Sequence, residues 1–590
     1  MNMKTTSITR RSNRAGSALI MTLIMSAIAL ALLAGAMSWS ASNTRLTYRS
    51  IQYKRSVAAA EAATEKVVSQ ISRDFLYGGE SLVINNLNIY RQSTVPSLTN
   101  SPYWSTWVFD DANGNTGQTY VQRGSAVKYA VLGSTYAGLK GFVSTYTIVS
   151  HARDTASLQD VTAGVLQQLQ LANIPIFQFA MYSSGDMEIS CGQRFDITGR
   201  VHSNGKLYVE PDSALIFESS VTAVIDIVFH RHPLDTRGTP PGTPSGSVLY
   251  VHPDQKVTPV TALTLPIGTT NTPEAIREII EPPPVGEDPN SPIGKLRYYN
   301  QCDMVLTVSD GGINDIGISA TSGHFVDGSK TSIPTNELVM FVSTANSFKD
   351  DREGKTVQPI DINIGKLAAW SLTNTSLRPR LSGSNLSSIY VVDRRTLPGT
   401  SLGAVRVVNG LQLPPNGLTV ATGRPLYVLG DYNQLNVANL GTSNTSTTLP
   451  ASLVADAITI LSDNWSDANS TSALASRTAS ATTVNAALLT GSVDTTAGHY
   501  SGGMENFPRF LESWGSANVF TYNGSMVKMF PSLYATGVWG QANVYNPPKR
   551  NWAYDNNFDD RTKLPPKTPS LLQTIRGQWA NVAPGQNAVP

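Results

Sequence analysis

An uncharged apolar stretch near the N-terminus is the feature that most restricts what this chain can fold into. No charged residue occurs between Arg14 and Arg45. As a helix, residues 17–39 would extend about 35 Å, and the hydrocarbon layer of a membrane is about 30 Å thick. We therefore predict one membrane-spanning helix.

The charges around this stretch are uneven. Four of the 44 lysines and arginines lie in the first 16 residues, which hold no acid, and the rest of the chain carries 40 basic and 42 acidic residues. The basic flank predicts a cytoplasmic N-terminus and a body outside the inner membrane. The remainder has no basic excess for nucleic acid, so no nucleic-acid partner is expected. A cleaved Sec signal is the rival interpretation, because Ala34–Ala36 reads AGA.

The residues that follow are also helical in character. Thr44 to Leu76 contains no Gly or Pro, and Gly78 and Gly79 predict its end. Mostly apolar residues recur at spacings of three, four or seven, namely Leu46, Tyr53, Val57, Ala60, Thr64, Val67, Ile71 and Phe75. This pattern predicts a continuous helix over 17–76, which a cleaved signal peptide does not need.

The leader ending in Gly16, the uncharged SALIMTLIM and the helix with AAAEAATEKV resemble the class III (prepilin) signal of type IV pilin-like proteins. The likeness is greatest to their PilX-like N-terminal family and extends to the minor pseudopilins of type II secretion. It implies that a prepilin peptidase cuts between Gly16 and Ser17, and that the new N-terminus is methylated. Most major pilins carry Glu at the fifth mature position. Here that residue is Met21, which implies a minor or tip subunit.

The body is predicted to be rich in β-strands. Between Asp186 and Val224 short apolar runs alternate with Gly, Asn, Asp and Ser turns, without a strict repeat. We expect a mainly β protein with one long N-terminal α-helix, and a body that resembles a β-solenoid (β-helix) or a sandwich. The last aromatic-rich part resembles the C-terminal region of large PilX-like proteins of Gram-negative bacteria, and we expect it to form an irregular layer over the β body.

Composition shifts suggest six regions. These are a basic leader, a pilin-like helix, a first β region, a Pro-rich insertion or linker with one short helix at PEAIREIIE, a second β region, and an aromatic and Pro-rich C-terminal region. We place them at residues 1–16, 17–76, 77–232, 233–297, 298–480 and 481–590.

Candidate catalytic and metal-binding patterns are weak. GTSLG at Gly399–Gly403 lacks a preceding strand and a following helix, as a nucleophile elbow requires. His230 and His232 have only His202 as a candidate third ligand. The loop with Asp111, Asn113 and Asn115 reads as a hairpin turn better than as a calcium loop. We expect no enzyme activity, no catalytic residue, no metal and no cofactor.

Two further patterns leave alternatives open. Glu505, Arg509 and Glu512 favour ion pairs over a substrate groove with paired carboxylates. In an exported body, Cys191 and Cys302 would form a disulfide or remain two buried thiols.

The sequence thus predicts a membrane-anchored, prepilin-like minor or tip subunit of a type IV pilus-type filament, whose β body serves assembly or cell adhesion. The expected partners are the inner membrane, a prepilin peptidase, other pilin or pseudopilin subunits and a surface glycan or host-cell ligand. The alternatives are a type II secretion minor pseudopilin and an exported β-helix protein that binds or cleaves polysaccharide.

Overall fold

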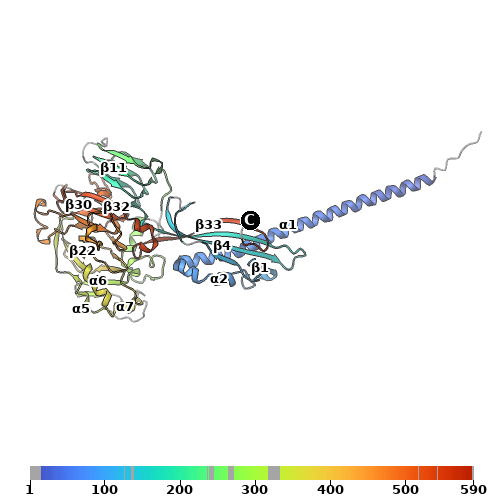
Figure 1. Cartoon of the computed structure of the whole chain (residues 1–590), viewed down its shortest axis with the longest axis horizontal. Coiled ribbons are helices and arrows are strands. Elements are labelled where there is room, and N and C mark those ends of the chain that lie inside the picture. The colour runs from blue at the N-terminus through green and yellow to red at the C-terminus, as the bar shows by residue number, and fades with distance from the viewer. Residues whose placement is uncertain are drawn as a thin grey trace, which may run out of the picture. The chain divides into compact units, whose positions relative to one another are not determined.

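The computed structural model describes residues 15–124, 127–133, 138–235, 237, 245–263, 272–315, 333–515, 517–540 and 543–587. It contains one long N-terminal helix and many strands in several sheets (Figure 1), which confirms the coarse fold class predicted above. The chain divides into two compact units. The helix unit comprises residues 1–127, 143–172 and 572–590, and the large unit comprises residues 128–142 and 173–571.

The helix unit combines helices with strands from both ends of the chain. Its sheet runs in the order β1–β4–β5–β33, and β1 and β2 both pair antiparallel with β4. The elements are α1 (Ala15–Asn85), α2 (Leu87–Gln92), η1 (Pro102–Thr106), β1 (Trp107–Asp110), β2 (Tyr120–Arg123), β4 (Lys140–Asp154), β5 (Ala163–Pro175) and β33 (Ser570–Val582).

Helix α1 is interrupted where the sequence predicts. Gly78 and Gly79 leave helical geometry, and Gly79 has a φ of 66°, which glycine adopts without a Cβ penalty. Helical turns then continue to Asn85, beyond the predicted end at Leu76. The buried carboxylate of Asp74 accepts hydrogen bonds from Tyr90 Oη at 2.6 Å and from Asn86 Nδ2 at 2.9 Å, and so ties α1 to α2.

The second half of α1 is buried on one side, but the buried stripe differs from the predicted one. Its predicted members Ala60, Thr64, Val67, Ile71 and Phe75 are buried, whereas Leu46 and Tyr53 are exposed. Small or polar residues hold other buried places, namely Gln52, Ser56, Ala59 and Ala63. Hydrophobicity alone misses them because a helix that packs closely on a sheet needs small side chains at the contact.

The aromatic residues of β1 explain the alanine run. Trp107 and Phe109 lie in one core cluster with Ala59, Ala60 and Ala63 of α1. Alanine methyl groups leave room for the indole and phenyl rings, so AAAEAA serves close helix–sheet packing as well as helix propensity.

The C-terminal strand completes the helix unit. β33 is the edge strand beside β5. Its Arg576 forms an ion pair with Glu65 of α1, with Nη2 2.7 Å from Oε2. Thr574 Oγ1 accepts a hydrogen bond from Ser72 Oγ at 3.2 Å. Residues more than 500 positions apart therefore close one sheet onto one helix.

The large unit begins with short parallel strands. They are β6 (Met181–Ser183), β7 (Met187–Ile189), β8 (Phe195–Ile197), β9 (Val201–Ser203), β10 (Leu207–Val209), β11 (Ala214–Phe217), β12 (Val221–Ala223), β13 (Ile227–Val228), β14 (Ser247–Tyr250) and β15 (Lys256–Val257). β3 (Lys128–Val131) precedes this series and pairs with β4 instead.

These strands follow a register of 20 residues that the sequence analysis missed. Met181 pairs with Val201 and Val201 with Val221, and the same step joins Met187 to Leu207 and Leu207 to Ile227. Phe195 pairs with Leu215 at the same spacing. The next step, from Leu215 to Val248, is 33 residues. This longer connection hides the repeat in the sequence.

The later strands of the large unit are longer. They are β16 (Met304–Ser309), β17 (Gly312–Asp315), β18 (Val342–Ser343), β19 (Phe348–Asp350), β20 (Lys355–Asn363), β21 (Ser388–Asp393), β22 (Ser401–Gly410), β23 (Leu418–Thr422), β24 (Leu426–Tyr432), β25 (Ala451–Ala455), β26 (Ile458–Leu461), β27 (Thr482–Asn485), β28 (Ala487–Ser492), β29 (Pro508–Phe510), β30 (Val519–Gly524), β31 (Met526–Pro531) and β32 (Lys549–Tyr554).

One eleven-stranded sheet joins the early and late strands. Its order is β15–β12–β9–β6–β31–β28–β25–β23–β21–β16–β17, and neighbouring strands are parallel except β16 and β17. The join is β31 with β6, where Met526 pairs with Met181. A ten-stranded sheet contains β18, β20, β22, β24, β27, β30 and β32 along its path, and β19, β26 and β29 beside it.

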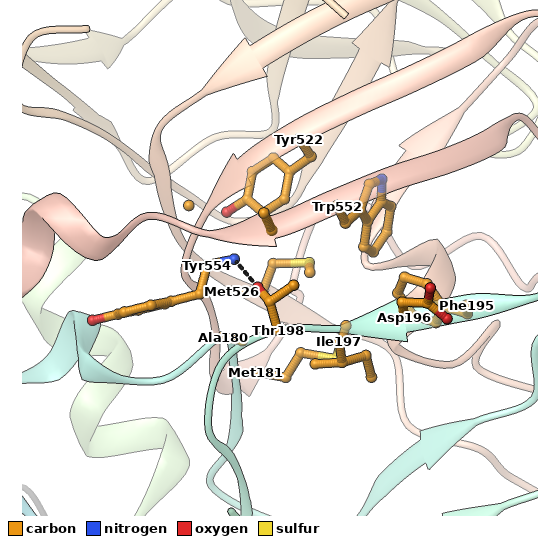
Figure 2. Close-up of a pocket in the computed structure, with 12 residues that line it drawn as sticks. Ala180, Met181, Phe195, Asp196, Ile197, Thr198, Tyr522, Met526, Trp552 and Tyr554 are labelled. Atoms are coloured by element: carbon orange, nitrogen blue, oxygen red, sulfur yellow. Dashed lines mark hydrogen bonds between the residues drawn. The ribbon is translucent and has the colours of Figure 1, made fainter. Parts of the chain in front are cut away.

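Side chains also fill the junction of the early and late strands. Figure 2 shows Phe195 facing Trp552, and their rings form an edge contact with centroids 5.2 Å apart. The backbone N–H of Tyr554 donates to Thr198 Oγ1 at 2.9 Å. The cavity that remains at this junction is about 10 Å³, which is enough for about one water molecule and too small for an organic ligand.

The helices of the large unit lie between or beside these strands. α3 confirms the predicted short helix in the Pro-rich region and continues into η5, with Ile279 and Ile280 buried. The bounds are α3 (Pro273–Arg277), η5 (Glu278–Ile280), α4 (Tyr298–Gln301), α5 (Thr335–Leu338), α6 (Ile364–Thr373) and α7 (Leu377–Arg380), with short 3-10 turns η3 (Ile176–Gln178), η4 (Pro253–Gln255), η6 (Val437–Asn439), η7 (Asp467–Asn469), η8 (Leu474–Ser476), η9 (Met504–Asn506), η10 (Asn556–Asp559) and η11 (Arg561–Lys563).

A buried ion pair connects α3 to the turn between β25 and β26. Arg277 Nη1 lies 2.7 Å from Asp456 Oδ1, and both side chains are almost fully buried. Asp456 also accepts backbone N–H groups from Leu533, Tyr534 and Ala535. The carboxylate is thus fully paired, which is the condition under which a buried charge is tolerated.

The aromatic C-terminal region does not form the irregular layer expected from its composition. It supplies β29 to β32, and Phe510, Trp514, Phe520, Tyr522 and Trp552 are buried in the main core cluster. The expectation failed because Asn and Pro between the strands hide the apolar alternation, while the large aromatic side chains fill the interior instead of covering it.

The close contact between α1 and β1 can be tested with matched alanine substitutions. We expect Ala60→Leu to lower the stability of the helix unit by about 1–3 kcal/mol, because the longer side chain overpacks the site beside Trp107. Ala58→Leu, two residues away and exposed, should change stability by less than about 0.5 kcal/mol. Calorimetric unfolding of the full chain in detergent measures both, and equal shifts would contradict the packing.

Candidate functional site

The N-terminal half of α1 is the candidate functional site because it is apolar and uncovered. Every described side chain from Ser17 to Ile51 is exposed. The helix contains an 18-residue window with a mean hydropathy of 2.4, so by length and composition it can cross a membrane. Large exposed side chains include Leu19, Ile20, Met21, Leu23, Ile24, Met25, Ile28, Leu30, Leu32, Leu33, Met37 and Trp39.

The change from exposed to buried occurs within one continuous helix. Ile51 is 49% exposed and the adjacent Gln52 is 5% exposed. From Ser56 onward the helix is held by the sheet, and Ser56 Oγ itself donates to the carbonyl of Val161 at 2.9 Å. The first half of α1 therefore projects apolar surface that a membrane or other helices can cover, while the second half fixes it to a folded unit.

The residues that the resemblance implicates lie at the start of this surface. The Gly16–Ser17 peptide bond is in the first turn of α1. Met21, which the resemblance places at the fifth mature position, is 70% exposed and presents an apolar thioether. A lone carboxylate at this position would be costly in lipid, and methionine is not.

Basic residues follow the apolar surface as well as precede it. Arg45, Arg49, Lys54 and Arg55 are all exposed on α1. Both flanks of the apolar segment are therefore basic, and the charge bias that would orient a membrane helix is small. The expected cytoplasmic N-terminus depends on the leader that resembles a prepilin signal.

The two cysteines are separate thiols. Cys191 and Cys302 are both buried and free, which corresponds to the second of the two alternatives left open by the sequence. Burial raises the pKa of Cys191 to about 12, so this thiol is neutral and unreactive at physiological pH.

The histidine and asparagine patterns take up structural roles. His230 and His232 follow β13 instead of lying on a strand, and both rings contact Tyr208. In the helix unit, Asp111 accepts backbone N–H groups from Asn113 at 2.9 Å and from Asn115 at 3.0 Å, which closes the loop as a turn. Ser401 is the first residue of β22, so a strand follows GTSLG where a nucleophile elbow needs a helix.

The three charged residues of ENFPRFLESW do not converge on one site. Glu505 accepts from the N–H of Ser190 at 3.2 Å, Arg509 pairs with Glu353, and Glu512 accepts from the N–H and Oγ of Ser462, both at 2.7 Å. Burial raises the pKa of both glutamates to about 7. Each charged group has its own partners, as expected for structural contacts.

A polar cavity in the large unit contains residues that the sequence analysis overlooked, above all Glu188 and Lys528. In the run MEI of β7, Met187 and Ile189 belong to the core, so the alternation of a strand turns Glu188 outward. That alternation was visible in the sequence. The segment that covers Glu188 comes from residues 495–501, and this contact could not be seen in the sequence.

No protein-family model matches the chain, and no curated protein does. A solved structure titled "Crystal structure of competence-associated pilin ComZ from Thermus thermophilus" is 10% identical with a TM-score of 0.28, over 90% of this chain and 97% of that one. A likeness at this TM-score carries no inference about fold or function.

The raised pKa of Glu512 gives a testable pH dependence. A folded-state pKa of about 7, above the unfolded value of ~4.3, means that Glu512 favours folding below pH ~4.3 and that this contribution is lost as the pH rises to about 7. The loss is roughly 3–4 kcal/mol for this one group.

We expect Glu512→Gln to reduce the loss of stability between pH 5 and pH 7 relative to the unsubstituted chain. The neutral amide removes this titration. Thermal unfolding of the full chain at several pH values measures the difference, with the exposed Glu218→Gln as control. Parallel pH profiles for the Glu512→Gln chain and the unsubstituted chain would contradict the assignment.

Proposed function

We propose that this chain is a prepilin-like minor subunit of a type IV pilus-type filament, anchored in the inner membrane by α1 until it is assembled. The observation that carries the proposal is the exposure pattern of α1, with apolar side chains uncovered from Ser17 to Ile51 and a folded unit holding the rest. A helix of this kind can be covered first by lipid and then by the helices of neighbouring subunits.

Processing follows from the same segment. A prepilin peptidase would remove residues 1–16, and methylation of Ser17 would follow. By the resemblance to a prepilin signal, the leader end of the chain would lie in the cytoplasm and the two folded units in the periplasm. The supporting features are the leader charge of +4, Gly16 at its end and the uncharged residues beyond it.

A minor or tip position is supported by Met21. A subunit without a carboxylate at its fifth mature residue offers no partner to the N-terminal amine of a neighbour. Its own amine can still pair with a carboxylate of another subunit. Such a chain can end a filament more readily than extend it.

The large unit would be the displayed part. We propose that its parallel strands form a β-solenoid, since successive strands pair at 20-residue steps in the early part and the late strands extend the same sheet. Its size suits display or adhesion to a cell-surface ligand. The proposal includes no catalytic step.

Processing can be checked on protein purified from its native membrane. We expect the mature chain to start at Ser17, because the cut removes the charged leader and leaves the apolar helix intact. Mass spectrometry of the N-terminal peptide identifies the start and any methylation. Gly16→Leu should remain uncut and stay in the membrane fraction. A start near Met37 would instead mean Sec cleavage and would contradict the filament role.

The tip position predicts where the protein occurs on filaments. We expect antibodies against the large unit to label filament ends in low copy, because Met21 cannot bind the amine of a following subunit. Immunogold electron microscopy of sheared filaments, with a deletion strain as control, measures this. Uniform labelling along the filaments would contradict a tip role, and loss of protein secretion without loss of pili would favour a type II pseudopilin.

A further inference from the structure

A polar cavity of about 320 Å³ in the large unit has an unbalanced set of charges. Its size is at the lower end of the range for small-molecule sites. Four carboxylates and one lysine line it together with one histidine, namely Asp186, Glu188, Glu274, Asp494, Lys528 and His232. Among the described residues that line the cavity, the one lysine is engaged, since Lys528 Nζ lies 2.6 Å from Asp494 Oδ1. Negative charge is therefore in excess.

Glu188 is the buried member of this set. Its side chain leaves β7 on the outward side and is 8% exposed. Oε1 accepts hydrogen bonds from Thr495 Oγ1 at 2.6 Å and from Ser501 Oγ at 3.1 Å. Oε2 is buried and accepts no hydrogen bond from any residue that the structure describes. A buried carboxylate oxygen without a donor is costly, so a ligand donor would be stabilised at this atom once the side chain turns it toward the cavity.

The neighbours of Glu188 are fixed by contacts of their own. Asp186 Oδ1 accepts the N–H of Lys206 at 2.7 Å, and its Oδ2 lies 3.8 Å from His232 Nε2. His232 Nδ1 accepts the N–H of Leu234 at 3.2 Å, so a neutral ring carries its proton on Nε2. These contacts hold the carboxylates in place and leave Glu188 Oε2 without a donor.

The chemistry of the donor set argues for an organic cation over a metal ion. Within the described parts of the chain, no three His, Cys, Asp or Glu side chains come together closely enough to hold a metal. A primary ammonium needs less convergence, because its three N–H groups donate in different directions and its charge offsets the excess of carboxylates.

We propose that this cavity binds a primary ammonium group of a polar ligand, with Glu188 Oε2 as its main acceptor and Asp186 at the entrance. A free polyamine and an amino sugar of a surface glycan both offer this group. The inference does not depend on the filament role, since every residue that carries it lies in the large unit.

The test is calorimetric titration of the full chain in detergent. The probes are spermidine, a glucosamine oligomer and its fully N-acetylated counterpart, which has the same sugar rings without the ammonium. We expect one or both amines to bind and the acetylated oligomer not to bind. Binding of spermidine alone would identify a polyamine site, and binding of the glucosamine oligomer alone would identify an amino-sugar site.

Glu188→Gln should weaken amine binding about 10- to 100-fold, because the charge-assisted hydrogen bond is lost. The variant should unfold at the same or a higher temperature, since it removes a buried charge. Glu218→Gln is the matched control, an exposed carboxylate of the large unit outside the cavity, and should leave binding unchanged.

Asp494→Asn tests the site without touching the buried residue. Asp494 has a side chain that is 67% exposed, so the substitution leaves folding intact. It releases Lys528, whose ammonium can then turn to Glu188 and compete with the ligand, so we expect weaker amine binding. The proposal is overturned if neither amine binds, if the acetylated oligomer binds equally well, or if Glu188→Gln binds the amines as tightly as the unsubstituted chain.

Discussion

The pairing of β31 with β6 is the contact on which the large unit depends. The chain completes the early strands from β6 to β15, leaves the sheet, and resumes at β16 on the far side of the strand order. It then adds strands one after another until Met526 meets Met181. Without this pairing two strand edges would be exposed, and exposed edges invite association with other chains. The edge contact between the rings of Phe195 and Trp552 packs the interior of the same junction.

Two buried carboxylates of the large unit each have several partners. Asp456 has Arg277 and three backbone N–H groups, and Glu512 has two groups of Ser462. At Glu188, as at Glu505, Oε1 accepts hydrogen bonds and the buried Oε2 accepts none from the described residues. Glu188 differs from Glu505 in lining the 320 Å³ cavity, so the cavity and the unpaired oxygen together mark it as a candidate binding group.

Local patterns predicted the helix but not the pairings. Absence of charge up to Arg45 and absence of Gly and Pro from Thr44 to Leu76 predicted α1, and Gly78 with Gly79 predicted its interruption. The exposure of its first half followed from hydropathy. The buried Ala59 and Ala63 were missed because their role depends on Trp107 of another element. The 20-residue register was hidden by the 33-residue step from Leu215 to Val248. Glu188 was overlooked because its cover, Thr495, is 307 positions away.

The chain passes between its two units four times, after residues 127, 142, 172 and 571. Because β33 returns to the sheet of the helix unit, a mechanical force on the large unit would be distributed over several covalent connections instead of one linker. A single proteolytic nick in any of these crossings would leave the units joined through the others. A subunit built in this way can lose the continuity of its backbone and still keep its displayed part attached.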